Sequence, residues 1–164
     1  MKSSQSALHR NHPVYSPEGS PSPSVARISE PPKTLLVVDD EPVVRDVMTQ
    51  VLRVEGYMVL PADGAAEALR LAREAAAIHL LITDFSMPGI DGFDLTRQFR
   101  AVHPETPVLM VSGSFQFLRV EIKPDLGRFD YLAKPFHPDE LLHKVRTLLD
   151  ATSPLPIRQL RCAD

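Results

Sequence analysis

Five polar residues in this sequence follow short apolar runs, and their side chains are of types that can do chemistry. The runs and the residues after them are Leu35–Val38 before Asp39 and Asp40, Leu80–Ile82 before Asp84, Val108–Val111 before Ser112, and Tyr131–Ala133 before Lys134. If the runs are parallel strands, their carboxyl ends meet at one edge of a sheet. The sequence therefore predicts three carboxylates, one hydroxyl and one ammonium at a common site.

Such a site favours a hard divalent cation and a phosphate. Carboxylates about 4 Å apart repel one another by roughly 4 kcal/mol per pair at an effective dielectric of about 20. A ligand set of oxygens without Cys or His selects Mg²⁺ or Mn²⁺ over zinc or copper. Lys134 and the Ser112 hydroxyl are then placed to receive phosphate oxygens. We expect phosphoryl transfer to a carboxylate, in which catalysis consists of positioning and charge neutralisation.

The elements that must position these groups alternate along the chain. The apolar runs are continuous, which is typical of strands buried on both faces of a parallel sheet, and Met58–Leu60 adds a fifth. Stretches with helical spacing follow the runs. In the first of them Val43, Val47, Val51 and Val54 are predicted to share one face, with Met48 and Leu52 beside it. The pattern predicts a doubly wound α/β domain over residues 33–150 with helices on both faces, in which the fourth helix, within 114–128, is short or irregular.

The two ends of the chain differ in composition from this domain. Residues 1–32 contain eight serines and six prolines, so we expect a disordered arm. Residues 151–164 read as a short flexible tail that cannot hold a second domain. The scattered histidines lack metal-ligand spacing and are expected to be structural, and the one cysteine, Cys162, to be an exposed tail thiol.

Composition excludes several classes of protein. The formal charge of −3 argues against a generic nucleic-acid binder, which needs a basic face. No apolar run approaches the roughly 20 residues of a membrane span, and no secretory signal stands at the N-terminus. The expectation is a cytoplasmic protein of one domain, without direct nucleic-acid or membrane contact.

Four segments in this order resemble the receiver domain of two-component response regulators. They are Leu36–Pro42 (LVVDDEP), Ile82–Gly92 (ITDFSMPGIDG), Val108–Gly113 (VLMVSG) and Tyr131–Phe136 (YLAKPF). The resemblance covers residues 33–150. It implies a flavodoxin-like fold with five parallel strands in the order 2-1-3-4-5.

The resemblance also implies a role for each acidic residue. Asp84 matches the phosphoacceptor. Asp40 and Asp84 match direct Mg²⁺ ligands, Asp39 reaches the ion through water, and the main-chain carbonyl of Ser86 matches a third protein ligand.

The remaining matches concern the response to the phosphate. Lys134 matches the lysine that pairs with the phosphoryl group, and the bond to Pro135 is implied to be cis. Ser112 matches the hydroxyl that moves to bind the phosphate, and Tyr131 the aromatic residue that swings inward with it. Ser112 stands where threonine is commoner, and the hydroxyl is kept.

The implied function is a stand-alone receiver that takes a phosphoryl group from a sensor histidine kinase or a histidine phosphotransfer protein. It would catalyse its own phosphotransfer and dephosphorylation, act as a monomer or weak dimer, and signal to a downstream protein through a changed surface. The alternatives are a phosphorylation-independent adaptor with the same fold and a phosphate sink in a relay. A dehalogenase-type phosphatase would need a second aspartate where Ser86 stands, and a nucleotide-binding domain would need glycines where Asp39 and Asp40 stand.

Overall fold

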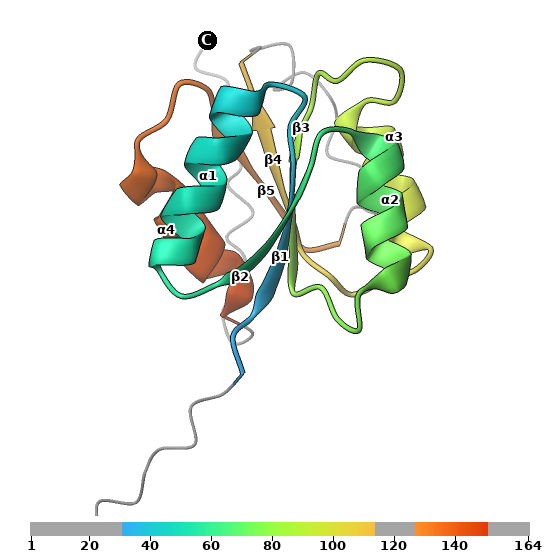
Figure 1. The fold of residues 1–164 in the computed structure, drawn as a ribbon, viewed down its shortest axis with the longest axis horizontal. Coiled ribbons are helices and arrows are strands. Elements are labelled where there is room, and N and C mark those ends of the chain that lie inside the picture. Colours follow the sequence, from blue (N-terminus) through green and yellow to red (C-terminus); the bar gives the residue numbers. More distant parts are fainter. Residues whose placement is uncertain (1–30, 114–126, 151–164) are drawn as a thin grey trace, which may run out of the picture. The chain divides into compact units, whose positions relative to one another are not determined.

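The computed structural model describes residues 31–113 and 127–150, which form one parallel sheet with helices on both faces (Figure 1). The five strands are β1 (Thr34–Val38), β2 (Met58–Ala62), β3 (Leu80–Asp84), β4 (Val108–Ser112) and β5 (Phe129–Ala133). They lie in the order β2-β1-β3-β4-β5, and every pair is parallel. The predicted fold class and strand order are confirmed.

Three of the predictions made from the sequence concern segments that lie wholly or mostly outside the described residues. The structure does not describe residues 1–30 of the predicted arm, the predicted tail at 151–164, or residues 114–126 of the segment expected to hold a short or irregular fourth helix. All the described residues belong to one compact unit of the chain.

Two helices cover each face of the sheet. Helices α1 (Pro42–Val54) and α4 (Pro138–Leu149) lie on one face, and α2 (Ala65–Glu74) and α3 (Gly92–Arg100) on the other (Figure 1). Each pair closes its own apolar core, one around Met48 and Leu141 and the other around Leu69 and Phe99. Strands β3 and β4 are buried along their whole length, which explains why their sequences are apolar without alternation.

The buried face of α1 differs from the predicted one. Met48 and Leu52 are fully buried, whereas Val43 and Val54 are 69% and 90% exposed. The helix carries two neighbouring apolar stripes, and the stripe with the larger side chains buries more apolar area against the sheet. Val43, Val47 and Val54 therefore remain at the surface.

The helices that follow β3 and β5 begin with side-chain caps at the carboxyl edge of the sheet. The Asp91 carboxylate accepts a hydrogen bond of 2.8 Å from the Asp94 N–H at the start of α3. His137 caps α4, and the Glu140 carboxylate accepts from the His137 N–H at 2.8 Å. These caps satisfy N–H groups that a helix cannot pair internally, and so fix where each helix starts.

Basic side chains hold the end of α4 at the opposite, amino edge. Lys33 donates from Nζ to the Leu149 carbonyl at 3.4 Å. Arg128 donates from Nη2 to the carbonyls of Leu148 at 2.7 Å and Asp150 at 3.1 Å. These bonds satisfy carbonyls that the last helical turn leaves open, and they join the starts of β1 and β5 to the end of α4.

Among the residues that the structure describes, no helix has the length and apolar character of a membrane span.

Candidate functional site

Three carboxylates meet at the carboxyl edge of the sheet. Asp39 and Asp40 follow β1, and Asp84 is the last residue of β3, which pairs with β1. One carboxylate oxygen from each lies within 4.8 Å of the others. The sheet order thus brings together side chains 44 residues apart in the chain, as the positions of the apolar runs indicated.

Asp39 is the fixed member of the cluster. It is fully buried. Its Oδ1 accepts a hydrogen bond of 2.9 Å from the Glu41 N–H, and its Oδ2 accepts one of 2.8 Å from Lys134 Nζ. Arg45 of α1 donates to the Asp39 carbonyl at 2.6 Å, which holds the main chain as well. Asp40, by contrast, is exposed to solvent.

Lys134 places a cation between two of the carboxylates. Its Nζ lies 2.8 Å from Asp39 Oδ2 and 3.3 Å from Asp84 Oδ2. Burial lowers the pKa of this ammonium, but the hydrogen bond and charge of Asp39, with the charge of Asp84, outweigh burial and raise the pKa above its ordinary value. Lys134 therefore stays charged at neutral pH. Its bond to Pro135 is cis, as the resemblance implied.

The Asp84 carboxylate has a pKa above its ordinary value. Burial is the main cause that raises its pKa, and repulsion from Asp39 adds to it. The charge and hydrogen bond of Lys134 and the main-chain N–H of Ser86 act in the other direction without cancelling the increase. A desolvated carboxylate of raised pKa is a better nucleophile than one in water, and a positioned cation beside it can receive an anionic substrate.

The main chain on either side of Asp84 is tightly held. The Phe85 N–H donates to the Val111 carbonyl at 2.8 Å, and the Gly92 N–H donates to the Phe85 carbonyl at 2.9 Å. The buried Thr83 hydroxyl donates to the Asp84 carbonyl at 3.0 Å. Sequence reasoning missed Thr83, whose only signal is a hydroxyl in an otherwise apolar strand. It also gave Gly92 no role of its own within the matching segment.

The other predicted site residues surround this cluster. Ser112 ends β4 and is buried, and its carbonyl accepts the Lys134 N–H at 2.8 Å. Ser86 is exposed, and its main chain reaches Asp84 through the N–H named above. Tyr131 is 37% exposed, with Lys144 Nζ 5.5 Å from the centre of its ring. The movements expected of Ser112 and Tyr131, and the ligand role of the Ser86 carbonyl, stay predictions.

The cluster fits a magnesium ion. Two oxygens bound to one Mg²⁺ lie roughly 3 to 4 Å apart, because each bond is about 2.0–2.1 Å. The carboxylate oxygens, all within 4.8 Å of one another, come close to this spacing. The donors are oxygens only, and one of them belongs to an exposed side chain that can share the ion with water.

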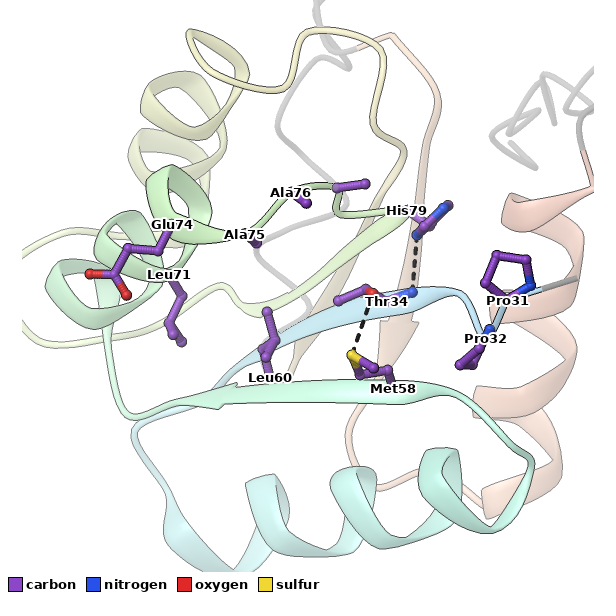
Figure 2. Close-up of a pocket in the computed structure, with 11 residues that line it drawn as sticks. Pro31, Pro32, Thr34, Met58, Leu60, Leu71, Glu74, Ala75, Ala76 and His79 are labelled. Carbon is purple, nitrogen blue, oxygen red and sulfur yellow. Dashed lines mark hydrogen bonds between the residues drawn. The ribbon is translucent and has the colours of Figure 1, made fainter.

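A groove at the amino edge of the sheet is a separate feature. It has a volume of about 530 Å³, and Pro32, Met58, Leu60 and Leu71 give it an apolar lining (Figure 2). The Thr34 N–H donates to His79 Nδ1 at 3.0 Å at its margin. The groove adjoins the starts of β1 and β2, so it lies away from the carboxylates that follow the strand ends.

The sequence matches a known family over most of the domain. A family model for the response regulator receiver domain matches residues 35–146. The transcriptional regulatory protein CreB of Escherichia coli is 35% identical over 117 residues, which are 71% of this chain and 51% of CreB. The regulatory protein VanRc of Enterococcus gallinarum is 39% identical over 116 residues, 70% of this chain and 49% of VanRc. The chain spans about half the length of the curated relatives it matches.

Solved structures agree with the family model. The chemotaxis protein CheY4 of Vibrio cholerae superposes with a TM-score of 0.65 at 30% identity, covering 72% of this chain and 99% of CheY4. TrrA of Thermotoga maritima, solved in complex with Mg²⁺-BeF, gives a TM-score of 0.63 at 32% identity, covering 71% and 99%. With this fold, with Asp39, Asp40, Asp84 and Lys134 at one edge, and with these matches, the chain belongs to the receiver domain family of two-component response regulators.

Proposed function

We propose that Asp84 accepts a phosphoryl group from a phosphohistidine of a sensor kinase or a histidine phosphotransfer protein. The observation that carries the proposal is the pairing of a buried carboxylate of raised pKa with an ammonium 3.3 Å away. Two further carboxylates within 4.8 Å supply the means to hold a cation. The Mg²⁺-BeF complex of TrrA supports the same assignment.

The transfer forms one bond and breaks one. A carboxylate oxygen of Asp84 attacks phosphorus and forms a P–O bond, while the P–N bond of the donor breaks and its electron pair returns to the imidazole nitrogen. Lys134 stands beside the attacking carboxylate, where its charge can meet the oxygens of the arriving phosphoryl group. Attack of water on the resulting acyl phosphate reverses the modification. The proposed catalysis therefore acts on the protein's own aspartate.

The proposed cofactor is Mg²⁺, with Mn²⁺ as a substitute. Asp40, Asp84 and the Ser86 carbonyl would hold it directly, and Asp39 through water. When bound, the ion supplies positive charge that offsets the carboxylates and the phosphoryl oxygens. Both carboxylate oxygens of Asp39 already accept hydrogen bonds, one from the Glu41 N–H and one from Lys134. This supports a place farther from the ion for Asp39 than for the exposed Asp40.

The proposed signal is a change of surface. A phosphoryl group adds a charge of about −1.5 to −2 at neutral pH and three acceptor oxygens. Ser112 and Lys134, whose main chains are joined at the ends of β4 and β5, would draw toward it, and Tyr131 would move inward from its exposed position. The phosphorylated receiver would then be recognised by a downstream protein, in the cytoplasm, with the chain itself a monomer or weak dimer.

Intact mass tests the proposal. The protein is incubated with Mg²⁺ and acetyl phosphate beside Asp84→Asn and a control, Asp46→Asn, which makes the same change at an exposed site on α1. We expect one phosphoryl group on the wild type and on the control, and none on Asp84→Asn. A wild type that binds Mg²⁺ but gains no mass would support the adaptor instead. A phosphorylated protein that loses the group within seconds would support the phosphate sink.

A further inference from the structure

The carbonyl of Asp84 is in close contact with two other residues, Thr83 and Gly92. The Thr83 hydroxyl donates to it at 3.0 Å. The first residue of α3, Gly92, stands against the same oxygen: a Cβ on Gly92 would lie 2.5 Å from it and 2.6 Å from the sulfur of Met110. The main chain of the reactive residue is thus enclosed by its neighbour in β3 and by a helix start.

Thr83 is fixed in its direction. It is fully buried, and its side chain is β-branched, which leaves χ1 few alternatives. A buried hydroxyl left without a partner destabilises the fold, so the hydrogen bond to the Asp84 carbonyl is strongly favoured once the strand is buried. The orientation of this peptide group is therefore coupled to the core and not to solvent.

Position 92 must be a glycine because there is no room for a side chain. Its Cα fits where any side chain would displace the Asp84 carbonyl, since real Cβ atoms do not approach other atoms to 2.5 Å. Its N–H is bonded to the Phe85 carbonyl at 2.9 Å, and its own carbonyl accepts the buried Thr96 hydroxyl at 2.7 Å. The start of α3 is consequently locked onto the two peptide groups that follow the reactive side chain.

We propose that Thr83 and Gly92 are positioning residues for Asp84: together they set the tilt of the Asp84 peptide and so the direction in which its carboxylate points. The inference rests on the proposed function, since it concerns how Asp84 meets the ion and the phosphodonor. Reacting atoms must be held about 3 to 3.5 Å apart and aligned, and a displacement of 1 Å can cost about 100-fold in rate. A peptide that can rotate would spread the carboxylate over less productive directions.

The test compares Thr83→Val with Thr83→Ser in the full chain. Valine keeps the shape and removes the hydroxyl, whereas serine keeps the hydroxyl. Thr106→Val is the matched control, because the Thr106 hydroxyl also donates to a main-chain carbonyl, that of Ile78, at 2.9 Å, but at the other end of the sheet. The measurements are the rate of phosphorylation by acetyl phosphate at saturating Mg²⁺, Mg²⁺ affinity by calorimetry, and thermal unfolding.

We expect Thr83→Val to be phosphorylated about tenfold more slowly, a smaller loss than a displacement of 1 Å would cause, and to bind Mg²⁺ several-fold more weakly. Thr83→Ser should restore both to within about twofold of the wild type. Thr106→Val should be destabilised to a similar extent, but its phosphorylation rate and its Mg²⁺ affinity should equal those of the wild type. A folded Thr83→Val with wild-type rate and affinity overturns the inference, as does a Thr106→Val that is equally impaired.

Gly92→Ala adds a steric change to the same peptide. We expect slower phosphorylation and weaker Mg²⁺ binding, and if this variant does not fold, the threonine series decides alone. The two proposals fail separately. A wild type that is never phosphorylated refutes the proposed function, yet Mg²⁺ affinity still shows whether Thr83 positions Asp84.

Discussion

Replacing Asp84 by asparagine should stabilise the magnesium-free protein. At an effective dielectric of about 20, the Lys134 ammonium, which lies 3.3 Å from the Asp84 carboxylate, attracts it by about 5 kcal/mol. The carboxylates of Asp39 and Asp40 lie within 4.8 Å, and each repels it by about 3.5 kcal/mol or more. The two repulsions exceed the attraction by about 2 kcal/mol, and burial of the charge adds to the penalty. Because Asp40 is exposed and screened, we expect a net gain of about 1 to 2 kcal/mol.

The gain in stability of Asp84→Asn over the wild type should be larger at neutral pH than in acid. The pKa of Asp84 is raised in the folded protein, chiefly by burial, so the ionised group destabilises the fold at neutral pH. As pH falls through this raised pKa, the folded wild type takes up a proton and the penalty disappears; below the unfolded value, near 3.9, none of it remains. The advantage of Asp84→Asn should therefore be complete at pH 7 and shrink in acid.

Urea unfolding in EDTA measures this difference, with Asp46→Asn as the control for loss of one negative charge. Mg²⁺ should reverse the order: at 100 times its Kd it adds about 2.7 kcal/mol to the wild type and less to a variant that lacks one ligand. A magnesium-free Asp84→Asn that is less stable than the wild type would refute the electrostatic reasoning. So would a difference between the two proteins that does not change with pH.

Three other substitutions test particular contacts. Lys134→Met leaves the carboxylates without their cation, so the free energy of unfolding in EDTA should fall by about 2 kcal/mol. Mg²⁺ should recover most of this loss, and an equal loss with and without Mg²⁺ would contradict the prediction. His103→Phe keeps the stacking on Phe99 and removes the 2.7 Å hydrogen bond to the Ala72 carbonyl, so the free energy of unfolding should fall by about 1 kcal/mol, which thermal melting would show as a decrease of a few degrees. Arg128→Gln should cost a similar free energy and raise amide exchange in the last turn of α4, and unchanged exchange there would exclude the proposed anchoring.

Much of this architecture is predictable because the physical signals are strong. Parallel strands buried on both faces must be continuously apolar, so β1, β3 and β4 are visible in the sequence, and parallel connections place their carboxyl ends together. The convergence of Asp39, Asp40 and Asp84 follows from that arrangement. The family resemblance then supplies the strand order, which periodicity alone does not determine.

Other features depend on packing that a one-dimensional pattern does not contain. Helix α1 has two apolar stripes, and only the assembled sheet selects Met48 and Leu52 over Val43 and Val54. The role of Thr83 depends on which carbonyl its hydroxyl meets, and that of Gly92 on how closely α3 approaches β3. The first is a side-chain direction within β3, and the second is a distance between two elements; the order of residue types specifies neither.

The bond between Lys33 and the end of α4 has a consequence for engineering. Because this bond joins the start of the first described strand to the end of the last described helix, the two ends of the described domain lie on the same side of the sheet, within reach of one lysine side chain. We expect that such a domain can be inserted into a surface loop of a host protein without separating the two ends of that loop. We also expect it to tolerate circular permutation. Asp84, the proposed phosphoacceptor, would then face away from the host.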